Sequence, residues 1–454
     1  MKNKYCKLSN ERGVAVIATL MFLMAMAVLT TALVFTVQHE MQASTVYKHG
    51  QQALNVANAG VQKSIQWYVN SYTPWATAAD YNLTTSPVQY GGHDVVFEGQ
   101  SEASTIFPSS TLSNSFASAM SNISLQATEG NSGAYAVNAT LQKYRPASFI
   151  NLATFLTYTS AIERWQLHSR GNWGGNVNRP LGVAQIVAVI ENSGNALFDR
   201  ALWGINSVDL GGTMMIDSYD PSLGPWNAAT NSGYLGAIGS NGDVNVGGTA
   251  DVHGDLAYGP GASYSIGGSA DVTGSKIQLA EPRYFPPIPP FSVDASNDVD
   301  VKSGKSATIS PGLFGSIDVK GALTLDPGTY YIDELSVTSN GQIIISDKTT
   351  LFVKTNLDME GQGVANTSWD PTKLTINYSG TNQVKMTGGS QAYVEVYAPN
   401  SELQLHGNAD FFGSFIAQDV VVIGGPQIHF SEGCLNDHLI QRPFRLITWS
   451  QNVN

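Results

Sequence analysis

The chain opens with an uncharged apolar run of 24 residues from Val14 to Val37. As a helix this run spans roughly 36 Å, enough for the hydrocarbon core of a membrane. Beyond it, apolar or small residues recur every three or four positions, and proline is absent before Pro74. This spacing predicts one face of a helix, made of Val46, Gly50, Ala53, Ala57, Val61, Ile65 and Tyr68. We therefore expect one continuous helix over 14–72, membrane-spanning in its first part and amphipathic in its second.

Residues 73–195 have a different pattern, with short alternating runs rich in β-branched side chains. Such alternation predicts strands, which we expect at 95–97, 123–127, 135–141, 165–169 and 182–191. An amphipathic helix must bury its apolar face on another element. We expect these strands to form a small sheet on the second half of the helix.

Residues 196–435 contain a repeat with a period near 20 residues. The segment Val246–Gly254, VGGTADVHG, recurs as Ile266–Gly274, IGGSADVTG, and further Gly-centred relatives occur near 211, 388, 407 and 424. A period of this length with short apolar runs is typical of a β-solenoid, whose glycine pairs turn the corners. The predicted fold is thus α+β and all-β: a long N-terminal helix with a small sheet, then a right-handed β-helix.

A proline-rich segment at 286–292 is unsuited to any strand. It is either a hinge in the solenoid or a strap across its face, and we expect it to divide two sets of coils. The predicted organisation begins with a leader (1–13), a helix (14–72) and a β-rich region (73–195). A first β-helix part (196–285), the hinge (286–292), a second β-helix part (293–435) and a C-terminal tail (436–454) follow.

Charge is scarce and unevenly placed. Only 13% of residues are charged, and the net charge of −12 argues against nucleic acid as a partner. The leader holds Lys2, Lys4, Lys7 and Arg12, which place the N-terminus in the cytoplasm by the positive-inside rule. Without residues 1–13 the chain has 19 basic and 34 acidic residues, a net of −15. We expect this acidic remainder to be exported.

Three interpretations of the N-terminus compete. A secretory signal peptide has a shorter apolar core, although Ala25-Met26-Ala27 is a conceivable cleavage site within this one. A plain one-pass anchor also fits. The third interpretation takes in the amphipathic continuation: a basic leader ending in Arg12-Gly13, followed by a long helix, resembles type IV pilins and pseudopilins.

The resemblance is strongest to PilX-type minor pilins, in RGVAVIATLMFLMAMAVLT and in QQALNVANAGVQKSI at 51–65. It implies that prepilin peptidase cuts after Gly13 and leaves Val14 as the mature N-terminus. The residues that we expect to pack the helix are Ala18, Val46, Ala53, Ala57, Val61 and Ile65. The resemblance implies other pilins of a filament as partners. Major pilins carry Glu at the fifth mature position, where this chain has Ala18. By analogy with related pseudopilins, this departure implies a place at the filament tip.

The C-terminal half resembles the β-helical domains found behind such N-termini, and distantly the bactofilins. The resemblance rests on DSYDPSLGP (217–225), LDPGTYYIDELSV (325–337) and IHFSEGC (428–434), among others. It implies architecture more than activity.

Candidate chemistry in this half is sparse. Asp217 and Asp220 are candidates for a glycosidase pair or a calcium site, and Asp251 and Asp271 would stack one coil apart. Asp beside Gly or Ser at a turn more often bonds its own backbone. His253, His406 and His429 are scattered, and Cys434 is the one cysteine left after leader removal. We expect a non-enzyme without a cofactor.

The sequence therefore predicts a minor pilin or pseudopilin-like subunit. We expect it in the inner membrane as a precursor and then in an extracellular filament, where its solenoid meets a surface polysaccharide, a solid surface or a partner subunit. Two alternatives stay open: a membrane-anchored carbohydrate-active β-helix enzyme, and an anchored scaffold that self-associates through its solenoid ends.

Overall fold

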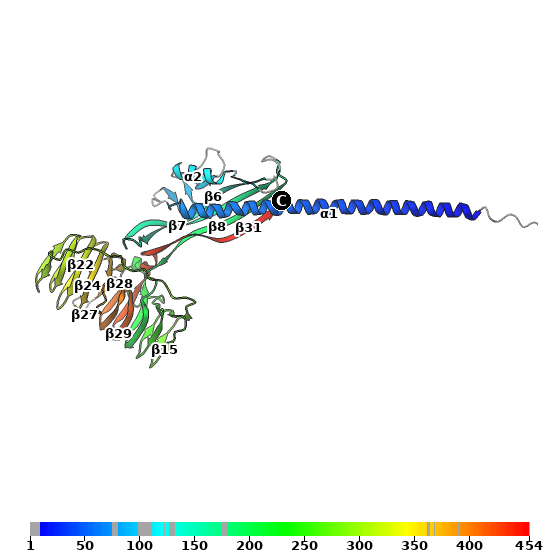
Figure 1. Ribbon diagram of the computed structural model, residues 1–454. Helices are drawn as coiled ribbons and strands as arrows, with labels where there is room; N and C mark the ends of the chain where they lie inside the picture. The colour runs from blue at the N-terminus through cyan, green and yellow to red at the C-terminus, as the bar shows by residue number, and fades with distance from the viewer. Residues whose placement is uncertain are drawn as a thin grey trace, which may run out of the picture. The chain divides into compact units, whose positions relative to one another are not determined.

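The computed structural model describes residues 10–74, 80–98, 110–121, 123–126, 132–174, 179–360, 364–366, 368–388 and 391–453. The chain forms two compact units. The first comprises residues 1–145, 162–193 and 443–454, and the second comprises 146–161 and 194–442. A long N-terminal helix followed by a mostly β chain, as predicted, is confirmed (Figure 1).

The first unit is built on helix α1 (Asn10–Asn70), which contains the whole apolar run and most of its amphipathic continuation. Its six-stranded sheet has the order β31-β8-β7-β6-β4, with β5 paired to β6. A short helix α2 (Ser110–Met120) contacts both α1 and β4. The sheet strands are β4 (Val96–Glu98), β5 (Ile123–Gln126), β6 (Ser132–Ile150), β7 (Thr157–Trp173), β8 (Gly182–Ala196) and β31 (Leu439–Val453). A separate small sheet holds β1 (Tyr81–Asn82), β2 (Gln89–Tyr90) and β3 (His93–Asp94).

Strand β31 corrects the prediction of a C-terminal tail at 436–454. Within this segment the first unit takes 443–454. Phe444 is buried, and its ring centroid lies 4.9 Å from that of Tyr68 on α1. The tail is a strand because it can bury this ring against the helix. The sheet region of 73–195 is therefore completed by residues from the far end of the chain.

The second unit contains a stack of strands in which every described pairing between two strands of the stack is parallel. Asp251 pairs with Asp271 at the predicted distance of one repeat. The corner glycines also stack: Gly248 has φ +69°, and a Cβ there would lie 2.2 Å from the carbonyl oxygen of Gly212. Only glycine fits such a corner. The hand of the predicted solenoid stays a prediction.

The strands of the stack fall into two runs along the chain. The first run comprises β9 (Leu202–Gly212), β10 (Met215–Tyr219), β11 (Ile238–Ser240), β12 (Asp243–Val246), β13 (Asp251–Val252), β14 (Leu256–Tyr258), β15 (Tyr264–Ile266), β16 (Asp271–Val272) and β17 (Lys276–Gln278). The second run comprises β18 (Val299–Val301), β19 (Ser306–Ile309), β20 (Leu313–Val319), β21 (Ala322–Leu325), β22 (Gly328–Val337), β23 (Gln342–Ile345), β24 (Thr349–Met359), β25 (Val364–Asn366), β26 (Leu374–Tyr378), β27 (Val384–Gly388), β28 (Ala392–Gly407), β29 (Asp410–Gly424) and β30 (Gln427–Ser431). Three 3₁₀ turns accompany them: η1 (Pro221–Leu223), η2 (Pro371–Lys373) and η3 (Glu432–Asn436).

The chain enters this stack in its middle. Strand β9 pairs with β11 and β12 on one side and with β29 on the other, and β10 likewise pairs with β13 and with β30. The first run therefore extends to one end of the stack, and the second run starts at the opposite end and closes back on β9 and β10.

The proline-rich segment connects these two ends as a strap, which was one of the two predicted alternatives, and in chain order it separates the two runs of strands. The Tyr397 hydroxyl donates to the Pro286 carbonyl at 2.6 Å, and the Phe291 ring lies 5.5 Å from that of Phe352. Farther along, the Asn297 amide donates to the Leu313 carbonyl at 2.8 Å. Prolines cannot donate to a strand ladder, so the segment lies on the stack without joining it. Both runs share one continuous apolar core.

Candidate functional site

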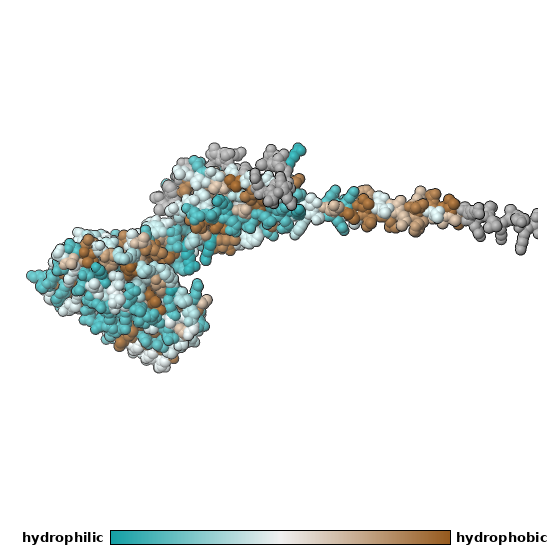
Figure 2. Space-filling model, viewed as in Figure 1, coloured by the Kyte–Doolittle hydropathy of each residue, from teal (hydrophilic) through white to brown (hydrophobic). Residues whose placement is uncertain are grey.

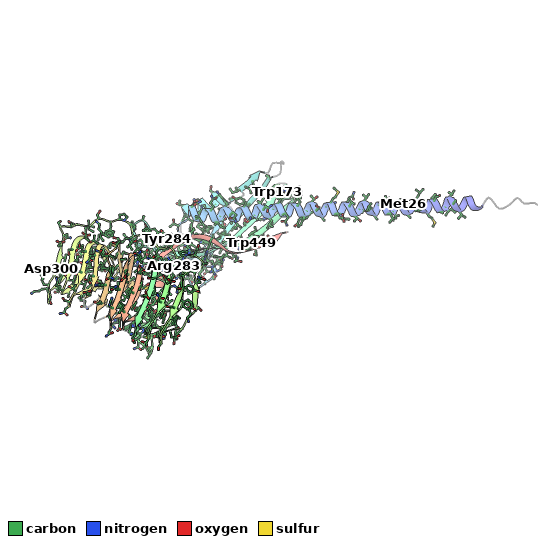
Figure 3. All side chains as sticks on the ribbon, turned by 60° about the horizontal axis from the view of Figure 1, so that its bottom comes forward. Met26, Trp173, Arg283, Tyr284, Asp300 and Trp449 are labelled. Atoms are coloured by element: carbon green, nitrogen blue, oxygen red, sulfur yellow. The ribbon has the colours of Figure 1, made fainter. Side chains whose placement is uncertain are left out.

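The exposed half of α1 is the candidate assembly surface. Every residue from Val14 to Lys48 is exposed, and within the described chain this is the one helix long and apolar enough to cross a membrane. Figure 2 shows this stretch in the colour of hydrophobic residues, and Figure 3 places Met26 on it. Exposed apolar area on this scale costs free energy in water. The surface therefore needs a membrane or other helices around it.

Hydroxyl groups on this surface bond to their own helix. Thr19, Thr30, Thr31, Thr36 and Thr45 each donate to a carbonyl four residues earlier, at 2.6 to 3.0 Å. Because each of these hydroxyl groups donates to its own helix, it needs no partner from water inside a membrane. The polar side chains of the run are thus compatible with an apolar surrounding.

The predicted packing residues divide into two groups along α1. Ala18 and Val46 are exposed, Val46 at 68%, so within this unit they pack against nothing. Ala53, Ala57 and Val61 are buried, and Ile65 is half-buried. Ala18 and Val46 stay predictions for contacts with other subunits, while the other four face inward. Gly13 lies within α1, and the leader residues 1–9 are outside the described residues.

Close backbone contact holds the second half of α1 to the sheet. A Cβ on Gly171 would lie 2.2 Å from the Ala53 carbonyl oxygen and 2.4 Å from the Ala57 nitrogen. The Ser169 hydroxyl donates to the Ala57 carbonyl at 2.7 Å. Strand β7 therefore approaches the helix so closely at position 171 that only glycine fits there.

A buried carboxylate and an aromatic cluster anchor the end of α1. Glu163 is fully buried and accepts bonds from the Tyr72 hydroxyl and the Trp165 indole, each at 2.8 Å. Burial, followed by the charge of Glu163, raises the pKa of Tyr144 to about 12. The surrounding rings are Trp67, Tyr68, Phe97, Phe116 and Phe444. The sequence signal for this anchor was weak, since a lone Glu in a strand gives no sign that it is buried.

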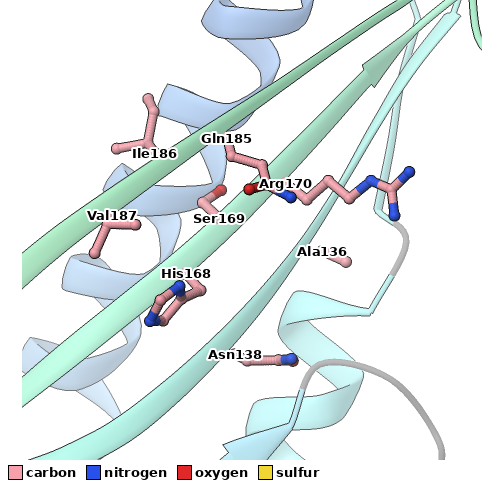
Figure 4. Close-up of a pocket in the computed structure, with 8 residues that line it drawn as sticks. All are labelled: Ala136, Asn138, His168, Ser169, Arg170, Gln185, Ile186 and Val187. Atoms are coloured by element: carbon pink, nitrogen blue, oxygen red, sulfur yellow. The ribbon is translucent and has the colours of Figure 1, made fainter. Parts of the chain in front are cut away.

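The opposite face of the sheet has a shallow pocket, shown in Figure 4. Its lining includes one imidazole and one guanidinium but no carboxylate, so these residues offer no acid–base pair. The pocket is lined by Ala136, Asn138, His168, Ser169, Arg170, Gln185, Ile186 and Val187.

The acidic candidates of the stack do not converge on one site. Asp217 is fully buried and bonds to His429, Trp226 and Ser232. Asp220 instead caps the turn η1 by accepting from the Ser222 nitrogen at 2.8 Å. Each carboxylate is occupied by its own protein donors. The calcium and glycosidase roles of the two residues stay untested predictions.

The remaining candidates take local roles. His253 lies 3.2 Å from Asp251 on the surface, and His406 lies 2.9 Å from Gln404. Cys434 is buried, and burial raises the pKa of its thiol well above the usual value. Sequence reasoning missed the groups around it, Glu395 and the pair Asp437 and His438, because they are distant in the chain and follow no motif.

Residues 335–436 match a family described as a domain of unknown function (DUF7305). No curated protein matches the sequence. Among solved structures, the competence-associated pilin ComZ from Thermus thermophilus is similar, with 10% identity over 73% of this chain and 87% of that chain. Its TM-score is 0.31, which is too low to establish a shared fold.

Proposed function

We propose that this protein is a minor pilin or pseudopilin-like subunit, built into a type IV pilus or related filament through α1. One observation carries the proposal: the helix is apolar and exposed from Val14 to Val37, and its continuation packs closely against a sheet. A membrane holds such a helix before assembly, and neighbouring helices cover it in a filament. The resemblance of the N-terminus to PilX-type pilins supports the same conclusion.

The precursor is inserted in the inner membrane with its basic leader in the cytoplasm, and prepilin peptidase cuts between Gly13 and Val14. Ala18 provides no carboxylate for the N-terminal amine of a neighbour, which supports a position at the filament tip. The assembled protein is extracellular. The parallel stack, which we propose is a right-handed solenoid, contacts a surface polysaccharide, a solid surface or another subunit.

Mass spectrometry of the mature N-terminus tests this proposal most directly. We expect a chain that begins at Val14. An intact Met1, or a cut after Ala27, contradicts it. Immunogold labelling then separates the filament subunit from the anchored scaffold: gold on sheared filaments supports the first, and gold confined to cell membranes supports the second.

We propose no catalytic role. The carboxylate of Asp217 is buried under Trp226 and bonded to three protein groups, which leaves it no position from which to attack a sugar. Turnover of an acidic or neutral polysaccharide that is lost in Asp217→Asn and in Asp220→Asn would instead favour the membrane-anchored enzyme.

A further inference from the structure

Three potential metal ligands meet in the interior of the second unit. Glu395 lies in β28, and Asp437 and His438 follow the turn η3. These residues are 0%, 8% and 3% exposed, and one ligand atom from each lies within 4.8 Å of the other two. Nδ1 of His438 is 3.1 Å from Oε2 of Glu395 and 3.4 Å from Oδ2 of Asp437.

Hydrogen bonding on the far side of the imidazole defines its protonation. The Thr375 hydroxyl donates to Oε2 of Glu395 at 3.2 Å and also lies 3.2 Å from Nε2 of His438. A hydroxyl has one proton, so Nε2 must be the donor in its contact with Thr375. In the neutral ring, Nδ1 then points a lone pair toward two carboxylates. This arrangement requires a cation at Nδ1.

A proton at Nδ1 fits the geometry less well than a metal ion does. Although two carboxylate oxygens are near, Nδ1 makes no hydrogen bond of acceptable geometry, and neither does Oε1 of Glu395. The observed separations instead suit two ligands of one ion, because metal–ligand bonds of about 2.0–2.1 Å at tetrahedral or octahedral angles put ligand atoms about 3.0–3.4 Å apart.

We propose that Glu395, Asp437 and His438 bind one divalent transition-metal ion, zinc before others. An imidazole with two carboxylates is a ligand set that zinc accepts. Metal-bound imidazoles commonly have their other ring nitrogen fixed by a hydrogen bond, which Thr375 provides. Cys434 is not counted as a ligand, because it does not belong to the group of residues whose ligand atoms lie within 4.8 Å of one another.

Backbone geometry agrees with a built site. His438 has φ +51°, a left-handed conformation that is uncommon for residues other than glycine, and its carbonyl accepts from the Leu197 nitrogen at 3.0 Å. Residues held in such conformations cluster at functional sites. Here the conformation brings the imidazole of His438 beside the carboxylate of the preceding residue.

The Lys348 ammonium competes with the metal ion for the carboxylate of Asp437. Its Nζ lies 2.8 Å from Oδ2 of Asp437, and its side chain is 37% exposed. In the metal-free site, the ammonium and a protonated His438 together balance two carboxylates. A divalent ion balances the same two charges from one centre, which frees the lysine to turn to solvent. The ion would tie β28 to the segment by which the chain leaves the stack.

The test uses the full-length protein in detergent, stripped by a chelator and dialysed against Zn²⁺ or Co²⁺. We expect about one zinc per chain and a visible Co²⁺ absorption band. Glu395→Gln and His438→Gln should weaken zinc binding by at least about 100-fold. The control His253→Gln removes a half-buried histidine that also has a carboxylate partner, and should keep the full stoichiometry. A wild-type protein that retains no zinc, or a His438→Gln variant that binds as the wild type does, overturns the proposal.

If Glu395→Gln and His438→Gln do not fold, Lys348→Met still tests the metal site, because it preserves all three ligands. Removing the competing ammonium should tighten zinc binding by about tenfold. Zinc should then raise the Tm of this variant more than that of the wild type. If the three residues and Lys348 form an ion-pair network alone, Lys348→Met lowers the Tm equally with and without zinc, and the proposal is wrong. None of these outcomes bears on filament assembly.

Discussion

Asp217 and His429 are paired residues of adjacent parallel strands, and their side chains bind each other, with Oδ1 of the aspartate 2.5 Å from Nδ1 of the histidine. Asp217 belongs to the first run of the stack and His429 to the second. The Trp226 indole and the Ser232 hydroxyl donate to the other carboxylate oxygen at 2.8 and 2.7 Å. This buried pair therefore joins β10, near the start of the first run, to β30, the last strand of the second run.

Asp217→Ala should destabilise the stack strongly. The change leaves the buried His429 and two less buried donors, Trp226 and Ser232, without their acceptor, and breaking a buried ion pair typically costs about 3–5 kcal/mol. The free energy of unfolding, measured by denaturant titration with tryptophan fluorescence, should fall by about that amount. Asp220→Ala is the matched control: it removes only a turn cap, worth about 1 kcal/mol. Equal losses for the two variants would contradict the distinction.

Gly171→Ala should loosen the second half of α1 from its sheet. The new Cβ meets backbone atoms of Ala53 and Ala57, which no side-chain rotation can relieve. Overpacking of this kind costs about 1–3 kcal/mol. We expect faster proteolysis within 50–70. Gly267→Ala should have no effect, because a Cβ there has open space within 4 Å. Unchanged protection in Gly171→Ala would show that the sheet can shift away.

Sequence patterns predicted what local periodicity encodes. The helix face from Ala53 to Val61 and the pairing of Asp251 with Asp271 both follow from regular spacing, and both are found. The patterns could not show that β31 returns to the first unit, because Phe444 meets Tyr68 across most of the chain. Entry of the chain into the middle of the stack was hidden for the same reason.

The candidate sites were predicted less well, because a residue type in a turn does not reveal its partners. Asp217 was noticed for its turn-rich sequence, DSYDPS, but its partner His429 is 212 positions away. Glu395, Asp437 and His438 lie in segments whose patterns predict only strand or turn. Burial brings these groups together, and burial of a charged group is set by tertiary packing rather than by local sequence.

Stability of the stack should fall in alkaline solution, in part through Tyr330. Its hydroxyl lies 2.8 Å from the carbonyl oxygens of Ile309 and Asp326, which share its one proton, and burial, followed by the charge of Asp326, raises the pKa of Tyr330 from 10.0 to about 12. The unfolded chain loses this proton first. The contribution to the free energy of unfolding is therefore complete below pH 10 and is lost as the pH rises to about 12.

Denaturant titrations at pH 9 and pH 11.5 check this effect against Tyr330→Phe. The variant should be less stable than the wild type at pH 9, because it lacks the one proton that the hydroxyl donates to these carbonyls, a hydrogen bond worth about 1 kcal/mol. Its stability should also fall less steeply between the two pH values. Equal slopes for the two proteins would assign the alkaline loss to other tyrosines.

Leu23→Asp should abolish membrane insertion and filament incorporation. Leu23 is 67% exposed in the middle of the apolar run, and an aspartate at the centre of a membrane helix costs about 2.5–3.5 kcal/mol. Because each 1.4 kcal/mol is a factor of ten, the inserted fraction should drop by more than about tenfold, as measured by immunoblot of membrane and sheared-filament fractions. Leu223→Asp is the matched control, since Leu223 is 71% exposed in the second unit and should tolerate the charge. Wild-type amounts of Leu23→Asp in sheared filaments would show that α1 is not the element that assembles.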